Sequence, residues 1–224
     1  MAEARIAVIG GSGLYNFLEP AETTLLSTPY GDPSGPITIV VVDGVSVAFL
    51  PRHGPHHTIP PHLINYRANL FALHSIGVER ALAPSAVGSL CAAMAPGHLV
   101  ICDQFIDRTW GRMSTYYEGP VVAHVSAADP YCAELRPLAV AAASASGFTV
   151  HERGTVLVSQ GPRFGTRAEA HFHRAAGADL LNMTQYPEVV LARELGMCYV
   201  NLSLVTDYDA GIEELPERAP VSQD

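Results

Sequence analysis

Short apolar runs alternate with amphipathic stretches along most of the chain. Two of the runs flank Asp43-Gly44, a dipeptide that favours a two-residue hairpin turn. Glycine or polar residues follow several others, which is typical of strand ends. The predicted strands are, in chain order, Arg5–Ile9, Ile37–Val42, Val45–Leu50, Arg80–Pro84, His98–Phe105, Gly154–Ser159, Leu180–Asn182 and Cys198–Val205.

Four other stretches have the apolar spacing or the composition of helices. In the first, His62–Ile76, one face carries the apolar residues Leu63, Tyr66, Leu70 and Leu73. The others are Ala133–Ser146, Arg167–Ala176 and Pro187–Leu195, and glycines follow the first and last of these three at positions where helices commonly end. Strands that alternate with helices indicate an α/β fold, a sheet flanked by helices on both faces.

Composition narrows the class of protein. The 224 residues are 48% hydrophobic and 16% charged, which is typical of a globular chain with one sizeable core. A net charge of -9 without a basic stripe argues against a nucleic-acid partner. No run is long enough to cross a membrane, and the N-terminus is too short and charged for a signal peptide, so we expect a cytoplasmic protein. The four cysteines have no CxxC spacing and are expected to be reduced, buried thiols: Cys91, Cys102, Cys132 and Cys198.

Two carboxylates, Asp207 and Asp209, follow the last predicted strand. Ligands of open α/β sheets bind at the carboxyl ends of strands. If the chain stays extended here, both side chains point the same way and can accept hydrogen bonds from a flat ligand edge such as that of adenine. The alternative is a solvated acidic turn closed by Gly211.

Other strand ends carry groups that suit a small tetrahedral anion. Gly10–Gly13 can direct backbone N–H groups and the Ser12 hydroxyl at an anion, although a plain tight turn is the alternative. Arg52-His53 offers a guanidinium, the side chain best shaped to bind an oxyanion. Ser85-Ala86 and Thr184 add further donors at strand ends. The glycine spacing fits neither a dinucleotide-binding nor a Walker A motif. A metal site is an alternative for His53, His56, His57 and His62, but they lie in a proline-containing loop rather than on a helix, so structural hydrogen bonds are expected for most of them.

Taken together and in order, these motifs resemble the methylthioadenosine phosphorylase branch of the trimeric purine nucleoside phosphorylase family. The resemblance extends from about residue 5 to about residue 211. The matching segments are Gly10–Leu14, Arg52–Gly54, Gln104–Thr109, Gly161–Phe164, Asn182–Thr184, Pro187-Glu188 and Thr206–Asp209. It implies a nucleoside phosphorylase-like fold, with one mixed central β-sheet in a single domain over residues 1–211 and a truncated or short tail over residues 212–224.

The resemblance also implies an activity, the phosphorolysis of a purine nucleoside. Inorganic phosphate replaces adenine at the sugar C1′ of 5′-methylthioadenosine, which gives 5-methylthioribose 1-phosphate. No metal or organic cofactor is implied, and phosphate is the co-substrate. The residues implied to bind phosphate are Ser12, Arg52, His53, Ser85, Ala86 and Thr184. Met183 is implied to lie under the ribose, and Phe164 and Asn182 beside the purine.

The resemblance implies a different role for each of the two carboxyl groups, Asp207 and Asp209. Asp207 is expected at purine N7, where a protonated carboxyl acts as the general acid. Asp209 is expected at the 6-amino group, because a carboxylate accepts from an amino group and repels a 6-oxo group. His124 matches a residue that this family donates to a neighbouring site, which implies a homotrimer.

Three alternatives remain open from the sequence. One is a phosphorylase of 6-oxopurine nucleosides or methylthioinosine, against which Asp209 argues. Another is a purine-binding protein that has lost catalysis, which the short segment 212–224 raises. The third, a Rossmann oxidoreductase, is disfavoured by the glycine spacing.

Overall fold

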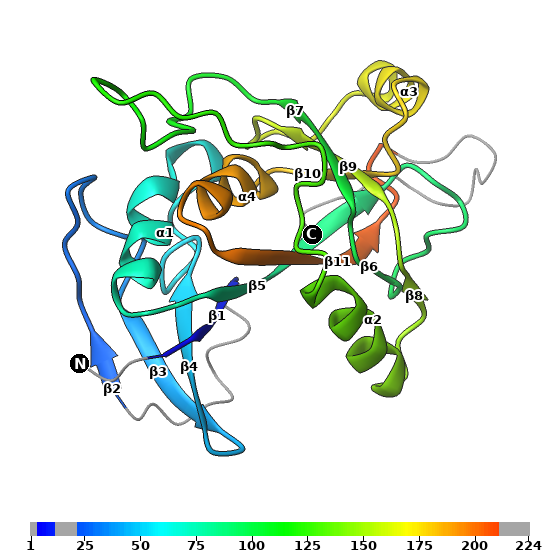
Figure 1. Cartoon of the computed structure of the whole chain (residues 1–224). Helices are drawn as coiled ribbons and strands as arrows, with labels where there is room; N and C mark the ends of the chain where they lie inside the picture. Colours follow the sequence, from blue (N-terminus) through cyan, green and yellow to red (C-terminus); the bar gives the residue numbers. More distant parts are fainter. Residues whose placement is uncertain (1–3, 12–21, 211–224) are drawn as a thin grey trace. The chain divides into compact units, whose positions relative to one another are not determined.

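The computed structural model describes residues 4–11 and 22–210. Its internal contacts divide the chain into two compact units (Figure 1). Unit 1 consists of residues 1–84, 111–128 and 187–199, and unit 2 of residues 85–110, 129–186 and 200–224. The long strands β5 (Arg80–Ser89) and β11 (Cys198–Asp207) contribute residues to both.

Unit 1 is built around a short parallel core of strands. The strand β1 (Ile6–Gly10) pairs in parallel with β4 (Val45–Pro51) and with the first residues of β5. Antiparallel pairing then adds β3 (Ile37–Val42) and β2 (Glu22–Thr24). The predicted β3–β4 hairpin is confirmed: its turn residues Asp43 and Gly44 have φ angles of 49° and 80°, and Val42 pairs with Val45.

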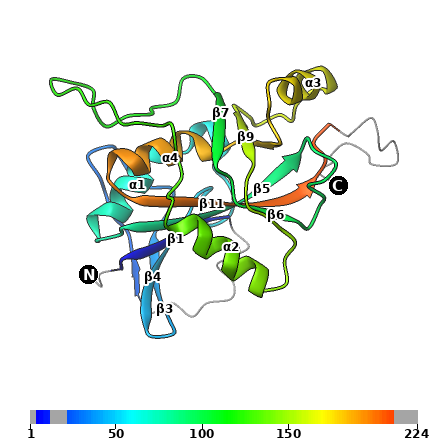
Figure 2. The same ribbon diagram turned by 45° about the vertical axis from the view of Figure 1, so that its right-hand side comes forward.

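Two helices pack in unit 1, α1 (Tyr66–Ser75) and most of α4 (Gln185–Glu194), and both views show them side by side (Figures 1 and 2). The prediction that α1 starts at His62 is wrong. The helix begins later because the Asn65 side chain accepts a hydrogen bond from the backbone N–H of Ala68 and caps it. Leu63 therefore lies in a 3₁₀ turn, Pro61–Leu63, and is 66% exposed.

Unit 2 has its own strand pairings. The strand β10 (Leu180–Asn182) is antiparallel to the end of β5 and parallel to β9 (Thr155–Ser159), which is parallel to β7 (Gln104–Arg108). The short strand β6 (Leu99–Val100) is antiparallel to β11 and parallel to β8 (Val150–His151).

The single strand predicted at His98–Phe105 is wrong, because it is divided between β6 and β7. The Arg136 guanidinium donates to the carbonyl oxygens of Cys102, at 3.0 Å, and Ile101, at 3.3 Å. A side chain thus takes the acceptors that a neighbouring strand would have used, and the ladder is interrupted there.

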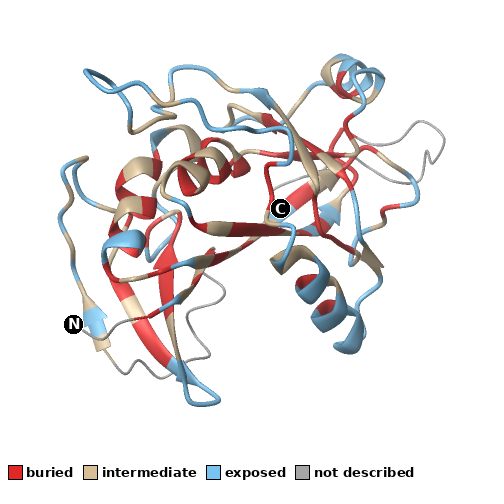
Figure 3. Cartoon of the chain, viewed as in Figure 1, coloured by how far each residue is buried: buried red, intermediate tan, exposed pale blue. Residues whose placement is uncertain are grey.

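The helices of unit 2 are α2 (Leu135–Ala145) and α3 (Arg167–Ala175). Only Ala139 and Ala143 of α2 are buried, and its outer face is exposed (Figure 3). Gly147, just beyond α2, has φ of 85°, so glycine follows the helix as predicted. The start of α3 is fixed by a capping box between Thr166 and Glu169.

The α/β class, with a mixed sheet flanked by helices, is confirmed. The single-domain boundary at residue 211 stays a prediction, and the expected tail, residues 212–224, lies outside the described residues. Within the described part of the chain no helix is long and apolar enough to span a membrane. The expectation of four reduced cysteines is wrong, because Cys132 and Cys198 are disulfide-bonded, whereas Cys91 and Cys102 are free.

Candidate active site

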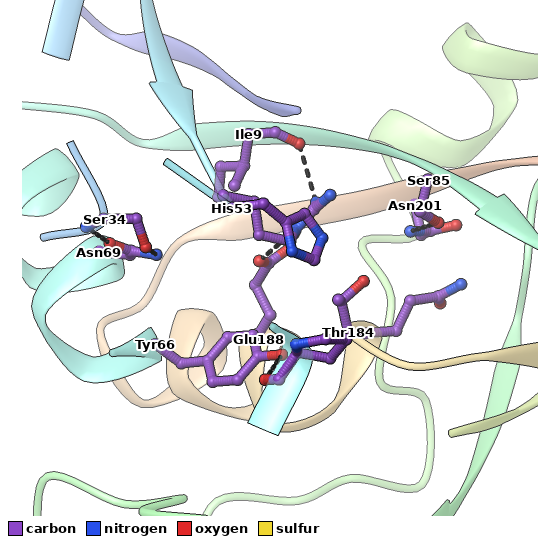
Figure 4. A network of polar contacts seen from close by, with 12 residues as sticks. Ile9, Ser34, His53, Tyr66, Asn69, Ser85, Thr184, Glu188 and Asn201 are labelled. Atoms are coloured by element: carbon purple, nitrogen blue, oxygen red, sulfur yellow. Dashed lines mark hydrogen bonds and ion pairs between the residues drawn. The ribbon is translucent and has the colours of Figure 1, made fainter. Parts of the chain in front are cut away.

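Arg52 follows β4 and is almost completely buried in unit 1, at 2% exposure. Its Nε and Nη2 atoms lie 2.8 and 2.9 Å from the two carboxylate oxygens of Glu188. The same guanidinium donates to the carbonyl oxygen of Ile9 at 2.8 Å (Figure 4). It also donates to the carbonyl oxygen of Pro84 at 3.0 Å. A guanidinium has five N–H groups, and the contacts among the described residues use four of them, which leaves one N–H.

Glu188 lies in α4 and is fully buried opposite Arg52. Burial by itself lowers the pKa of Arg52, but the charge and hydrogen bonds of Glu188 outweigh it and raise that pKa above its usual value. The Tyr199 hydroxyl donates a further hydrogen bond to Glu188 Oε1, at 2.7 Å. Arg52 and Glu188 therefore link the ends of β1 and β4 and the middle of β5 to α4 within unit 1.

His53, next to Arg52, is oriented by its own loop. Its Nδ1 lies 2.9 Å from the carbonyl oxygen of Ile59, and its ring stacks on His57 at 4.3 Å between centroids. Burial lowers the pKa of His53, so the ring is neutral at pH 7. Because Nδ1 faces a carbonyl, it carries the proton, and Nε2 is left as an acceptor. The described residues contain no group of three or more His, Cys, Asp or Glu that could hold a metal.

In unit 2, Ser85 and Ala86 lie in the second half of β5. The prediction that a strand ends at Pro84, just before them, is wrong, because β5 continues to Ser89, where it pairs with β10. Ser85 Oγ accepts a hydrogen bond from Asn201 Nδ2 at 3.1 Å, which leaves its own proton to be donated elsewhere (Figure 4). Ala86 is exposed, and its carbonyl oxygen accepts from Asn182 Nδ2 at 3.3 Å. The neighbouring strand β11 thus fixes Ser85, and β10 contacts Ala86.

Asn182 and Thr184 form the turn between β10 and α4. Asn182 Oδ1 accepts from the backbone N–H groups of Thr184, at 2.7 Å, and Gln185, at 2.8 Å. Asn182 is therefore a cap that orients the start of α4, and it holds the buried Thr184 in place. Met183, between them, is half-buried.

The acidic pair at the end of β11 differs from the extended arrangement expected. Asp207 is the last residue of the strand, but Asp209 has φ of 47°, so the chain has left the extended conformation. The Asp209 backbone N–H donates to Asp207 Oδ1 at 2.7 Å, and the Thr206 hydroxyl donates to Asp207 Oδ2, also at 2.7 Å. A turn closed by the Asp207 side chain thus sets the positions of both carboxyl groups.

Asp209 is 5% exposed, and its Oδ2 has no hydrogen-bond partner among the described residues. Burial raises the pKa of Asp209, and the nearby carboxylates of Asp207 and Glu169 raise it further against a backbone hydrogen bond from Ala210. Glu169 behaves in the opposite way: hydrogen bonds from Arg163 and Thr166 lower its pKa to about 2. Asp209 is therefore a buried carboxyl group whose pKa is raised, and it lies near Glu169, which stays ionised.

The loop before α3 carries Phe164, which is 42% exposed, and Gly165. Gly165 and Glu169 border a cavity of about 350 Å³ in unit 2. Its other lining side chains include Arg108, Trp110, Gln160, Phe172 and His173. The loop thus lies between Asp209 and an open cavity of mixed aromatic and charged lining.

The structure therefore places most of the expected site residues at the ends of strands. It brings Arg52 and His53 together in unit 1, where His124 also lies, exposed. In unit 2 it brings Ala86 to Asn182, Asn182 to Thr184, and Asp207 to Asp209. Ser12 lies outside the described residues.

Residues 5–223 match the profile of a family described as the phosphorylase superfamily. The chain belongs to this family. A relative from Pyrococcus horikoshii named S-methyl-5′-thioadenosine phosphorylase is 56% identical over 94% of this chain and 81% of its own length. A relative from Pyrococcus furiosus named 6-oxopurine nucleoside phosphorylase is 50% identical over 93% of this chain and 81% of its own length.

Solved structures of the phosphorylase superfamily show the same fold. Methylthioadenosine phosphorylase from Schistosoma mansoni, solved in complex with adenine, superposes with a TM-score of 0.91. It is 36% identical, and the alignment covers 98% of this chain and 83% of that one. The nucleoside phosphorylase-like fold implied by the motifs is thereby confirmed.

Several residues that organise these sites were not singled out as site residues from the sequence. Glu188 and Tyr199 hold Arg52, Asn201 orients Ser85, and Glu169 faces Asp209. A buried arginine always needs a partner, but its identity is set by the fold. For Glu169 a local signal exists, because Thr166-x-x-Glu169 has the spacing of a capping box.

Breaking the buried ion pair should strongly destabilise the protein. We expect Glu188→Gln to lower the free energy of unfolding by about 3–5 kcal/mol, because it leaves the Arg52 charge buried without a counterion. The matched control is Glu79→Gln, which removes an exposed ion pair with Arg5 and should change little. Urea denaturation measures both, and equal effects would contradict the importance given to the Arg52–Glu188 pair.

Asp209 should make stability depend on pH. Its pKa is raised in the folded state, so its contribution is fully present below the unfolded pKa of about 3.9 and is lost as pH rises through the folded pKa. Asp209→Asn should therefore be more stable than the parent near neutral pH, with the difference vanishing in acid.

Asp43→Asn is the control for this comparison, because Asp43 also has positive φ, 49° against 47°, but is exposed. Any gain from asparagine in the left-handed conformation is common to both variants. Urea midpoints measured across the acidic and neutral range give the result, and a pH-independent difference for Asp209→Asn would refute it.

Proposed function

We propose that this protein cleaves 5′-methylthioadenosine with inorganic phosphate, as a phosphate-dependent pentosyltransferase that releases adenine and 5-methylthioribose 1-phosphate. The family membership and the names of its relatives support a nucleoside phosphorylase. The observation that carries the choice of adenine is the carboxylate pair Asp207 and Asp209 at the end of β11, with Asp209 almost fully buried. Asp209 can accept from a 6-amino group and Asp207, when protonated, can donate to N7, so the pair suits this edge of adenine.

Phosphate is the nucleophile in the proposed reaction. From unit 1, Arg52 offers its remaining N–H, and neutral His53 offers Nε2 as an acceptor for a P–OH hydrogen of phosphate. The resemblance also assigns phosphate contacts to the Ser85 hydroxyl, Ala86 and Thr184. Ser12 completes the set that the resemblance implies.

The bond changes are simple to balance. The C1′–N9 bond breaks with its electron pair leaving on the purine, and a phosphate oxygen forms a bond to C1′ from the opposite face. Positive charge develops on the sugar, and the bound phosphate anion stabilises it, an effect of the kind worth about 3–4 kcal/mol per well-placed group. Neither a metal nor an organic cofactor takes part, and phosphate is the co-substrate.

Recognition of the purine is assigned to unit 2. Asp207, when protonated, donates its proton to N7 as adenine leaves, and Asp209 accepts from the 6-amino group. We place Met183 under the ribose and Phe164 and Asn182 beside the base. Phe164 is exposed and so is accessible to a ligand, whereas Asn182 acts mainly through the turn that it caps.

A second candidate, a 6-oxopurine nucleoside phosphorylase, is favoured by the 50% identity to a relative of that name. It requires a hydrogen-bond donor opposite O6, which ionised Asp209 does not provide. We also propose that residues 1–211 form the nucleoside phosphorylase domain and that residues 212–224 lie outside it.

We further propose a homotrimer in which His124 reaches the neighbouring site. Its support is the surface around His124, where Val121 and Val122 are 65% and 72% exposed. Apolar side chains so exposed are typical of a segment that contacts another protein. We also propose a cytoplasmic location, as expected from the sequence.

The direct test is adenine release from methylthioadenosine with and without phosphate, with inosine in parallel. We expect phosphate-dependent release from methylthioadenosine and little from inosine near neutral pH. Asp207→Ala should lose about 10²–10⁴-fold in kcat, the range for a general acid. Nucleoside binding without turnover in the parent protein would indicate a purine-binding protein instead, and release from inosine alone would indicate a 6-oxopurine phosphorylase.

The trimer is tested by the mass in solution, which should be about three times the 23.9 kDa of one chain. His124→Ala should raise KM for methylthioadenosine by about tenfold, as expected for losing one hydrogen bond, and leave the mass unchanged. His74→Ala, at the exposed end of α1, is the control and should alter neither. Full activity in a monomeric species would contradict the proposal.

A further inference from the structure

The Asp209 carboxyl is held in a setting that resists ionisation. The preceding strand and the Asp207 side chain fix its backbone, and the next residue, Ala210, is buried in a hydrophobic cluster with Ala170 of α3. Asp209 is 5% exposed, and its Oδ2 is buried without a partner among the described residues. An ionised carboxylate in such a position loses hydration that nothing replaces.

Two further carboxylates face Asp209, and the charges that act on it among the described residues are these two negative ones. From β11, Asp207 contacts the Asp209 backbone. From α3, Glu169 lies across Gly165: a Cβ built on this glycine would be 3.5 Å from Asp209 Oδ2 and 4.0 Å from Glu169 Oε2. From β5 the neighbour is Gly88, which carries no charge.

Glu169 is a fixed negative charge over the useful pH range. Arg163 donates to both of its oxygens, at 2.6 and 2.8 Å, and the Thr166 backbone N–H donates at 2.7 Å. These bonds lower the pKa of Glu169 to about 2, so it stays ionised while Asp209 titrates. Arg163 is paired with Glu169, and Asp209 experiences the negative charge of the Glu169 carboxylate.

We infer that Asp209 is a titrating selector of the purine 6-substituent: ionised, it admits 6-amino purine nucleosides, and protonated, it also admits 6-oxo ones. This inference rests on the proposed function and deepens it. The neutral acid can hold its proton on either oxygen, so the oxygen that meets the purine can donate to O6. The ionised form can only accept, which suits an amino group and repels O6.

Retaining 6-amino substrates in acid follows from the same chemistry. A protonated carboxyl still has a carbonyl oxygen, which accepts from an amino N–H. Acidification therefore adds substrates rather than exchanging one class for another. The site then behaves much as an asparagine would in this position.

The test is the ratio of kcat/KM for 5′-methylthioinosine to that for 5′-methylthioadenosine, measured in the same buffers from about pH 5 to about pH 8. The two substrates share the sugar, the 5′ group and phosphate, so the titrations of phosphate and His53 cancel in the ratio. We expect the ratio to rise as pH falls, by up to about tenfold per pH unit, and then to level off below the pKa of Asp209.

Two variants assign the effect. Asp209→Asn should give a high ratio that does not change with pH, because its amide always offers a donor. Glu169→Gln keeps the side-chain length and can still cap α3, but removes the fixed charge, so the rise should move to lower pH. An unshifted curve would overturn the part given to Glu169.

A flat ratio in the parent enzyme would overturn the inference, as would an unchanged pH dependence in Asp209→Asn. Both outcomes leave the proposed function standing, because methylthioadenosine would still be cleaved. No phosphate-dependent adenine release at any pH would be a failure of the proposed function itself.

Discussion

The buried ion pair between Arg52 and Glu188 is the constraint on which the strand ends of unit 1 depend. Removing both charges from water costs several kcal/mol per ion, which only good geometry and further hydrogen bonds can offset. Both are present, because Glu188 binds the guanidinium through both oxygens and accepts from Tyr199. Arg52 also binds the carbonyl oxygens of Ile9 and Pro84. Ile9 precedes the segment Gly10–Gly13 and Pro84 precedes Ser85-Ala86, and both segments are assigned to phosphate binding. An arginine held so firmly can offer an anion a fixed N–H with little loss of entropy.

Asp209 shows the opposite use of a buried charge. Where Arg52 is surrounded by partners, Asp209 has a buried oxygen with none among the described residues and two carboxylates nearby. Partners offset the cost of burying the Arg52 charge, whereas burial without partners raises the pKa of a carboxyl group. Burial therefore has different consequences for the two groups: partners fix the Arg52 side chain, whereas the pKa of Asp209 is raised.

Much of the fold could be predicted from local sequence. The β3–β4 hairpin followed from Asp43-Gly44, and the strand that ends at Asp207 followed from its apolar run. The errors came from side chains that act over short and long distances. Asn65 moved the start of α1 by capping it, and Arg136, far along the chain, divided the strand predicted at His98–Phe105.

The site divides in the same way. Strand ends pointed to Arg52 and the acidic pair, because polar groups that follow buried strands lie at the ligand-binding edge of α/β sheets. Ser85 was expected on the same argument, but it lies inside β5. The partner of Arg52 is 136 residues away in the chain, so no spacing could have identified Glu188. The left-handed backbone of Asp209 also escaped prediction, since aspartate adopts that conformation only when its surroundings favour it.

Gly165 gives this site a means of evolving without altering any group that meets the substrate. A methyl group there would be at ordinary van der Waals distance, 3.5 Å, from Asp209 Oδ2, so alanine fits the space. It would exclude water between two carboxyl groups and strengthen their repulsion, since charges interact more strongly when water is absent. Given the selector role proposed for Asp209, Gly165→Ala could therefore extend the substrate range to 6-oxopurine nucleosides at neutral pH. The reverse substitution could narrow the range again.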